Sequence, residues 1–228
     1  MPITTCIFDA YGTLFDVAAA ARQAASEPQF SKIKDTWPQL AEHWRLKQLQ
    51  YTWLRAITQA HTDFWEVTQD GLDWALEKCG VDGDAELRER LLALYWELQA
   101  YPEVPEMLQT LKTAGLNTAI LSNGSPDMLD GAVQSAGIET LLDDNLSVQS
   151  VGIFKPDSRV YDLVGQRFGC AKDEVLFVSS NGWDAVGATG YGFTTAWVNR
   201  SGEPMDRMPW KPKHVLRDLT NIPKIVGL

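Results

Sequence analysis

The first strand-like segment of the chain has no partner close to it in sequence. Residues 3–8 (ITTCIF) form a short apolar run, rich in β-branched residues, that is typical of a buried strand. The segments that follow, over residues 16–96, have helical patterns, and strand-like runs return after residue 115. A strand needs neighbours to be stable. The first strand must therefore pair with later strands across a long helical insertion.

The insertion contains well-marked helices. Residues 37–61 lack glycine, and the one proline, Pro38, falls in the first turn. Residues 64–79 end before Gly80, and residues 84–100 carry leucines at helical spacing. The first of these helices has two apolar stripes: Leu40, Trp44, Tyr51 and Leu54, and Leu46, Leu49, Trp53 and Ile57. We expect it to be buried on two sides, one against its own domain and one against a cleft or another subunit.

From residue 103 onward, helical and strand-like segments alternate. The helical segments are residues 103–114, 125–137, 157–169 and 184–192, and the strand-like segments are residues 116–123, 174–180 and 194–199. Such alternation predicts an α/β fold with a Rossmann-like parallel sheet flanked by helices. We place this core at residues 1–15 and 97–228 and the inserted all-helical domain at residues 16–96. The proline-containing tail after Asn199 is expected to be irregular surface structure.

Composition and charge exclude several classes of function. The formal net charge of −10 argues against a nucleic-acid partner, which requires a basic surface. The first residues lack the features of a signal peptide, and no apolar run is long enough for a membrane span. The cysteines, Cys6, Cys79 and Cys170, are widely spaced and are interpreted as core thiols. We therefore expect a cytoplasmic protein without a membrane or nucleic-acid partner.

Polar residues follow the ends of the predicted strands. In parallel sheets, ligands bind beyond the carboxyl ends of the strands. The residues that this rule brings together are Asp9, Ser122, Asn123, Gly124, Ser179, Ser180, Asn181 and Asp184, with Lys155 in a loop between them. The sequence therefore predicts one polar site at this edge of the sheet.

Asp9 is the candidate nucleophile of that site. It directly follows the first strand, and the next residues, YGTLFD, supply a glycine turn and a hydroxyl, Thr13, that can hold a carboxylate. A carboxylate placed near Lys155 stays ionised and can attack an electrophile. The alternative is that Asp9 only caps the turn, but the polar ends of the other strands favour the catalytic role.

The motifs together resemble those of a known enzyme family. DAYGTLFD, LSNG, KPDSRVY and VSSNGWDA occur in the order found in the haloacid dehalogenase superfamily, and within it in the L-2-haloacid dehalogenases. The similarity extends from residue 3 to about residue 200. It includes WRLKQLQYTWLR in the insertion, which resembles the family's helical cap domain.

Tyr11 separates this chain from the phosphatases of the superfamily. The phosphatases have DxD, in which the second aspartate protonates the leaving group, and a later acidic pair that helps to hold magnesium. Here Tyr11 replaces the second aspartate, and SSNGWD leaves Asp184 alone. A halide leaves without a proton, and substitution at an sp3 carbon needs no metal. We therefore expect no metal and no cofactor.

The resemblance implies a two-step hydrolysis of a small anionic 2-haloalkanoate. Asp9 would attack C2 with inversion, and water would then hydrolyse the aspartyl ester to a 2-hydroxy acid. Lys155 would orient Asp9. Ser122 and the backbone amides of Asn123 and Gly124 would bind the substrate carboxylate, at the start of a helix.

The resemblance also assigns the remaining site residues. Arg45 would accept the halide, although without the resemblance it would be placed on a solvated face. Asp184 would activate the water, or cap the helix that follows. Thr13, Ser179, Asn181 and Tyr161 would have positioning roles. Tyr11, Trp183 and Leu46 would line the substrate pocket. Leu46 stands where the family often has a glutamine.

Two other interpretations stay open. A phosphatase-like hydrolase of the same fold would depend on magnesium and fits poorly with Tyr11. A catalytically idle binding protein would lack Asp9 or Lys155, and both are present. The family commonly forms homodimers, and a helix buried on two sides is compatible with a homodimer here.

Overall fold

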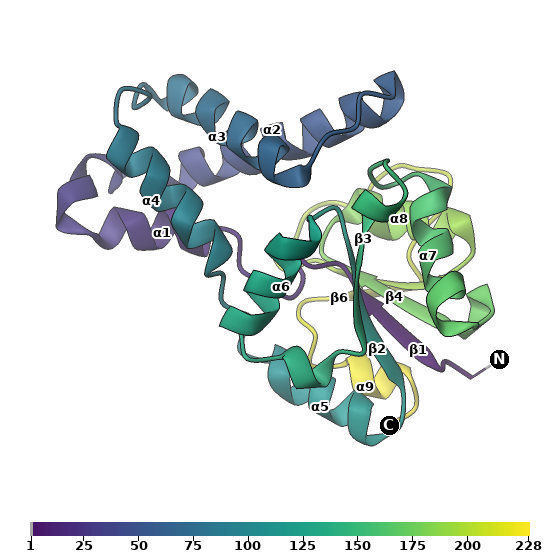
Figure 1. Cartoon of the computed structure of the whole chain (residues 1–228). Helices are drawn as coiled ribbons and strands as arrows, with labels where there is room; N and C mark the ends of the chain where they lie inside the picture. The colour runs from purple at the N-terminus through teal and green to yellow at the C-terminus, as the bar shows by residue number, and fades with distance from the viewer. Residues whose placement is uncertain (1) are drawn as a thin grey trace.

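The structure is a computed structural model that describes residues 2–228. Within these residues, six strands form one sheet in which every neighbouring pair is parallel (Figure 1). In sheet order they are β3 (Asp144–Ser147), β2 (Asn117–Ser122), β1 (Thr5–Phe8), β4 (Val175–Ser179), β5 (Thr194–Val198) and β6 (His214–Leu216). This is the strand order of a Rossmann-like fold. The first strand does pair across the insertion, with β2 on one side and β4 on the other.

The sheet of the core is flanked by helices. The helices of the core are α5 (Val104–Thr113), α6 (Pro126–Ser135), α7 (Ser158–Phe168), α8 (Gly182–Tyr191) and α9 (Ile222–Ile225), with short 3-10 turns η2 (Glu139–Leu141), η3 (Val148–Ser150) and η4 (Lys172–Glu174). Strands β1 and β4 are buried along their whole length, as central strands covered on both faces must be. The fold class predicted from the alternating pattern is confirmed.

The helices between β1 and α5 form a separate group beside the sheet (Figure 1). They are α1 (Ala19–Ser26), η1 (Pro28–Ile33), α2 (Trp37–Thr58), α3 (Phe64–Cys79) and α4 (Ala85–Trp96). Helix α3 begins where the Asp63 carboxylate accepts a hydrogen bond from the Trp65 amide, and it ends at Gly80, whose φ is +68°. At Gly71 a Cβ would lie 3.3 Å from the backbone nitrogen of Gln48, so α2 and α3 approach each other closely.

The two chain segments that join the helical group to the sheet run side by side. The Asp16 amide donates to the Gln99 carbonyl (3.0 Å), and the Tyr101 amide donates to the Leu14 carbonyl (2.9 Å). Arg200 fixes this crossing from the end of β5, because its Nη2 donates to the Thr13 carbonyl at 3.1 Å. The entry to the helical group is thus tied to the loop that follows β1.

The expected irregular tail is wrong in part. Residues 214–216 form β6, which extends the sheet at its β5 edge, and Leu219 and Ile222 are fully buried. Strand β3 was also not predicted, because its sequence, DNLS, has neither an apolar run nor β-branched residues. Both strands lie at the edges of the sheet, where pairing with a formed neighbour can fix a segment whose own pattern is weak.

The expected burial of α2 on two sides is not met within one chain. Leu40, Trp44 and Leu49 are buried, but Leu46 and Ile57 are 56 % and 79 % exposed, and Leu54 is also exposed. One side of this helix therefore presents an apolar stripe to solvent in the single chain.

Candidate active site

The candidate site lies at the switch point of the sheet. Asp9 directly follows β1, and the Asp9 amide donates to the Val178 carbonyl of β4 at 2.9 Å. After β1 the chain continues to β2 on one side of β1, and it later returns to β4 on the other side. The connections to the two neighbouring strands therefore run in opposite directions from this point. Such a divergence opens a crevice at the carboxyl ends of the strands. The fold itself therefore places the Asp9 carboxylate at the edge of the sheet where a ligand can bind.

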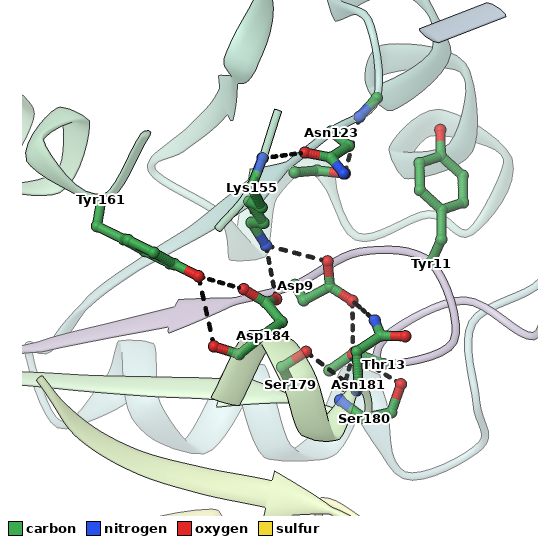
Figure 2. Close-up of polar contacts among 12 residues, drawn as sticks. Asp9, Tyr11, Thr13, Asn123, Lys155, Tyr161, Ser179, Ser180, Asn181 and Asp184 are labelled. Atoms are coloured by element: carbon green, nitrogen blue, oxygen red, sulfur yellow. Dashed lines mark hydrogen bonds and ion pairs between the residues drawn. The ribbon is translucent and has the colours of Figure 1, made fainter. Parts of the chain in front are cut away.

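Two carboxylates share one buried ammonium at this point (Figure 2). Lys155 Nζ lies 3.2 Å from Asp9 Oδ1 and 2.9 Å from Asp184 Oδ2. Asp9, Lys155 and Asp184 are 6 %, 1 % and 0 % exposed. Burial by itself lowers the pKa of Lys155, but the attraction of Asp184 and Asp9 outweighs it, and the pKa ends above the ordinary value. The two carboxylates therefore favour the charged form of Lys155.

The two oxygens of Asp9 have different surroundings. Oδ2 accepts hydrogen bonds from Thr13 Oγ1 (2.9 Å) and Asn181 Nδ2 (3.0 Å), whereas Oδ1 accepts one from Lys155. A carboxylate oxygen has two lone-pair directions, so Oδ2 is saturated and Oδ1 keeps one direction for a further contact. Oδ1 is the oxygen that the geometry leaves able to attack an electrophile.

Asp184 is held by a second hydroxyl. Tyr161 Oη donates to Asp184 Oδ1 at 2.8 Å, and burial, with the nearby Asp184 charge, keeps the pKa of Tyr161 well above its ordinary value. Burial raises the pKa of Asp184 itself, and the Lys155 ammonium opposes that rise. The N-cap of α8 is Asn181, and Asp184 lies inside the first turn. The alternative role of Asp184 as the cap of this helix is therefore wrong.

The loop after β2 closes another side of the site. Asn123 Oδ1 accepts a hydrogen bond from the Lys155 amide (3.0 Å), and Ser122 Oγ accepts one from the Gly124 amide (3.1 Å). The ring of Tyr11 lies directly against Gly124, where a Cβ would be 2.8 Å from Tyr11 Cε2. Only glycine permits this approach. The buried Tyr11 Oη has no hydrogen-bond partner among residues 2–228, so it is free to bind a ligand.

Arg45, from the helical group, reaches the site. From α2, its Nη2 donates to the Tyr11 carbonyl (2.9 Å) and to Asn181 Oδ1 (3.0 Å). The side-chain amide of Asn181 therefore links Arg45, through Oδ1, to Asp9, through Nδ2. Arg45 does not lie on a purely solvated face, which was the alternative interpretation of this residue.

The remaining predicted residues differ in position. Ser179 is fully buried, and its Oγ accepts a hydrogen bond from the Asn181 amide at 3.1 Å. Trp183 packs edge-on against Trp53 and lines a neighbouring apolar cavity of about 640 Å³. Leu46 is exposed and borders a surface hollow with Trp53. The structure thus places Ser179 in the hydrogen-bonded cluster and leaves Trp183 and Leu46 outside it.

Sequence reasoning missed two residues around the site, Tyr95 and Gln48, and it named Ser180 without giving it a role. Ser180 contributes an amide that donates to Thr13 Oγ1 at 2.8 Å. Tyr95 stacks on Tyr11 with ring centroids 5.5 Å apart, and Gln48 contacts Arg45. A polar residue one helical turn after Arg45 was the available signal for Gln48, since residues three apart share a helix face.

The part of the chain that the structure describes has neither a cluster of metal-ligating side chains nor a membrane-spanning helix. Residues 2–228 contain no group of three or more His, Cys, Asp or Glu side chains arranged to hold a metal ion. The position between Asp9 and Asp184 is filled by the Lys155 ammonium. None of the described helices is long and apolar enough to cross a membrane.

Fold and site together define a Rossmann-like α/β protein with a buried carboxylate–ammonium–carboxylate group at its switch point. Comparison with known proteins narrows this class. The model of the haloacid dehalogenase-like hydrolases matches residues 3–192, and the chain belongs to that family.

Individual relatives agree over nearly the whole chain. (S)-2-haloacid dehalogenase 1 of Pseudomonas sp. (strain CBS-3) is 41 % identical over 225 residues, which cover 99 % of this chain and 97 % of the relative. (S)-2-haloacid dehalogenase 4A of Burkholderia cepacia is 39 % identical over 96 % of this chain and 93 % of its own. L-2-haloacid dehalogenase from Xanthobacter autotrophicus, solved with chloropropionic acid covalently bound, superposes with a TM-score of 0.87 at 35 % identity and 99 % coverage of both chains.

Proposed function

We propose that the protein is a (S)-2-haloacid dehalogenase, which hydrolyses L-2-haloalkanoic acids to D-2-hydroxyalkanoic acids and halide. The observation that carries the proposal is the buried Asp9, whose Oδ1 is oriented by Lys155 and keeps one lone pair free. The relatives named above, similar over nearly the full length, support the same substrate class.

In the first step, Asp9 Oδ1 attacks C2 of the substrate from the side opposite the halogen. The carbon–oxygen bond forms as the carbon–halogen bond breaks, the electron pair leaves with the halide, and the configuration at C2 inverts. Thr13 and Asn181 hold Oδ2, so the carboxylate presents Oδ1 without reorganisation. The Lys155 ammonium, 3.2 Å from Oδ1, orients the carboxylate and balances its charge.

Arg45 accepts the departing halide. Its guanidinium, a planar cation, donates a hydrogen bond to Asn181 beside the nucleophile. The halide becomes negative only as the bond breaks, so a fixed cation there stabilises the transition state more than the substrate.

In the second step, water attacks the carbonyl carbon of the Asp9 ester. Asp184 takes one proton from this water and gives it to the oxygen of the departing 2-hydroxy acid. The second proton of the water stays on the new Asp9 carboxyl group, and its release to solvent regenerates the Asp9 carboxylate. Burial favours this role, because it raises the pKa of Asp184 and so makes the carboxylate a better base. Tyr161 and Lys155 fix the orientation of Asp184, and Ser179 supports the neighbouring loop.

The loop after β2 binds the substrate carboxylate. Ser122 Oγ and the amide of Asn123 precede helix α6, whose N-terminus favours an anion, and the Gly124 amide donates to Ser122 Oγ beside them. The unpartnered Tyr11 Oη beside Gly124 supplies one further donor. The predicted pocket roles of Trp183 and Leu46 stay predictions.

The proposal also covers the domain organisation, the oligomeric state and the cellular location of the protein. Residues 16–96 act as a cap that carries Arg45, and residues 1–15 and 97–228 act as the catalytic core, without metal or cofactor. The exposed stripe of Leu46, Leu54 and Ile57 supports a homodimer, because large exposed apolar groups mark association surfaces. The three unpaired cysteines fit a reducing compartment, the cytoplasm.

The proposed activity is tested by halide release from L- and D-2-chloropropanoate, each with excess EDTA and with added magnesium, alongside p-nitrophenyl phosphate. Halide release from the L form alone, unaffected by EDTA, is expected. Phosphate-ester hydrolysis that requires magnesium, without halide release, would replace this proposal by the phosphatase-like one.

A further inference from the structure

The buried side-chain amide of Gln48 contacts Arg45 within the cap. Gln48 lies on α2 one turn after Arg45 and is 1 % exposed. Its Nε2 donates to Thr68 Oγ1 (2.7 Å) and to Tyr95 Oη (3.2 Å), and its Oε1 accepts from Arg45 Nη1 (3.5 Å). A polar side chain buried among helices is retained only when its hydrogen bonds are made. The mechanism described above gives it no role.

Thr68 fixes which end of the amide faces Arg45. The Thr68 hydroxyl donates its proton to the Phe64 carbonyl at 2.8 Å, which leaves a lone pair directed at Gln48. Only the amide nitrogen can satisfy that lone pair, so the amide oxygen must point the other way, toward Arg45. The close approach of α2 and α3 at Gly71 brings Gln48 and Thr68 within this distance.

Arg45 is consequently held from two directions. On the core side, Nη2 donates to the Tyr11 carbonyl and to Asn181 Oδ1. On the cap side, Nη1 donates to Gln48 Oε1. A guanidinium is a planar fork, so fixing both terminal nitrogens fixes the plane in which its other N–H groups point. Without the contact to Gln48, the plane could turn about the contacts made by Nη2.

We propose that Gln48 is a positioning residue, which orients the Arg45 guanidinium toward the departing halide, with Thr68 setting the direction of its amide. This inference rests on the proposed dehalogenase function. Preorganised charge stabilises a transition state because no reorganisation is needed as the charge develops. A poorer leaving group depends more on that stabilisation, so the loss of Gln48 must weaken chloride displacement more than bromide displacement.

The test compares variants in single-turnover halide release from L-2-chloropropanoate and L-2-bromopropanoate. Gln48→Met removes the amide and keeps the side-chain length, so that the adjoining cavity of about 350 Å³ does not open further. Thr68→Val removes the orienting hydroxyl, and Thr68→Ser retains it. Thr52→Val is the matched control, because Thr52 is equally buried on α2 and its hydroxyl donates to the Leu49 carbonyl of the same helix.

Gln48→Met is expected to slow chloride release roughly 10-fold and bromide release about 3-fold, while hydrolysis of the ester keeps its rate. Thr68→Val should show the same chloride preference, and Thr68→Ser and Thr52→Val should behave as the wild type. Equal losses for the two halides in both Gln48→Met and Thr68→Val would overturn the inference alone. No halide release by the wild-type protein would overturn the proposed function, and this inference with it.

Discussion

The two halves of the candidate site are built differently. On the core side, Asp9, Lys155 and Asp184 are buried; Asp9 and Asp184 follow the neighbouring strands β1 and β4, and Lys155 comes from the loop before α7. On the cap side, one long side chain, Arg45, reaches across from α2 and is itself partly exposed. The core half is thus part of the folded interior, and the cap half is attached to it by a few hydrogen bonds.

This difference separates stability from activity. Removing one member of a buried ion pair leaves an uncompensated charge in the interior, which destabilises the fold strongly. Removing a partly exposed cation costs little stability. Substitutions in the core half should therefore affect both properties, unless they preserve shape and hydrogen bonding, and substitutions in the cap half should affect turnover alone.

Asp9→Asn tests the core half with shape preserved. We expect turnover to fall by roughly 10⁴-fold or more, because a neutral amide does not displace the halide. The amide can still accept a hydrogen bond from Lys155, so the thermal midpoint should remain close to that of the wild type. Halide release at an undiminished rate would remove Asp9 from the mechanism.

Lys155→Met tests the core half with charge removed. Asp9 and Asp184 would face each other in the interior without the ammonium, and we expect the free energy of unfolding to fall by about 3–5 kcal/mol. Activity should be lost as well. Urea unfolding measures the change, and a stability equal to that of the wild type would contradict the buried-charge account.

Arg45→Met tests the cap half. Loss of the halide acceptor should lower the rate of halide release roughly 10²–10³-fold, as removal of a transition-state donor does in other enzymes. The free energy of unfolding should change by less than about 1 kcal/mol, since the guanidinium is partly exposed. A loss of stability comparable to that of Lys155→Met would mean that the two halves are not distinct.

The pH dependence of ester hydrolysis sharpens the comparison within the core. Burial raises the pKa of Asp184 above its ordinary 3.8. As the pH falls through this raised pKa, Asp184 becomes protonated and cannot take a proton from water. Product formation after the halide burst should therefore decline on the acid side, measured by rapid quench. A rate of product formation that stays constant toward acid pH would argue against Asp184 as the base.

Leu46→Gln should have the smallest effect. The side chain is largely exposed and lies outside the polar cluster, so we expect halide release to change less than about 2-fold. Comparison of chloride and bromide substrates would reveal a pocket role that the position of Leu46 does not suggest.

Sequence predicted the core half of the site better than the cap half. Asp9, Asn181 and Asp184 follow strands whose apolar runs are unmistakable, and parallel pairing necessarily gathers such strand ends at one edge. Strands β3 and β6 escaped prediction because their pairing depends on neighbours already in place, not on their own pattern.

On the cap, neighbours in sequence were weaker guides. Leu46 follows Arg45 directly but is rotated by about 100° around the helix, and so it faces away from the polar cluster. Gln48 shares the face of Arg45, but its importance depends on Thr68 and Tyr95, which come from other helices. Such contacts exist only in the packed structure.

The central claim is that Asp9 forms a covalent ester, and isotope transfer during one turnover tests it most directly. Enzyme in excess over L-2-chloropropanoate is mixed in ¹⁸O-labelled water, and both the product and the peptide containing Asp9 are analysed by mass spectrometry. Because water attacks the ester carbonyl, the account predicts label in Asp9 and unlabelled oxygen at C2 of the first-turnover product. Label in that product, with none in Asp9, would show that water displaces the halide directly and would contradict the account.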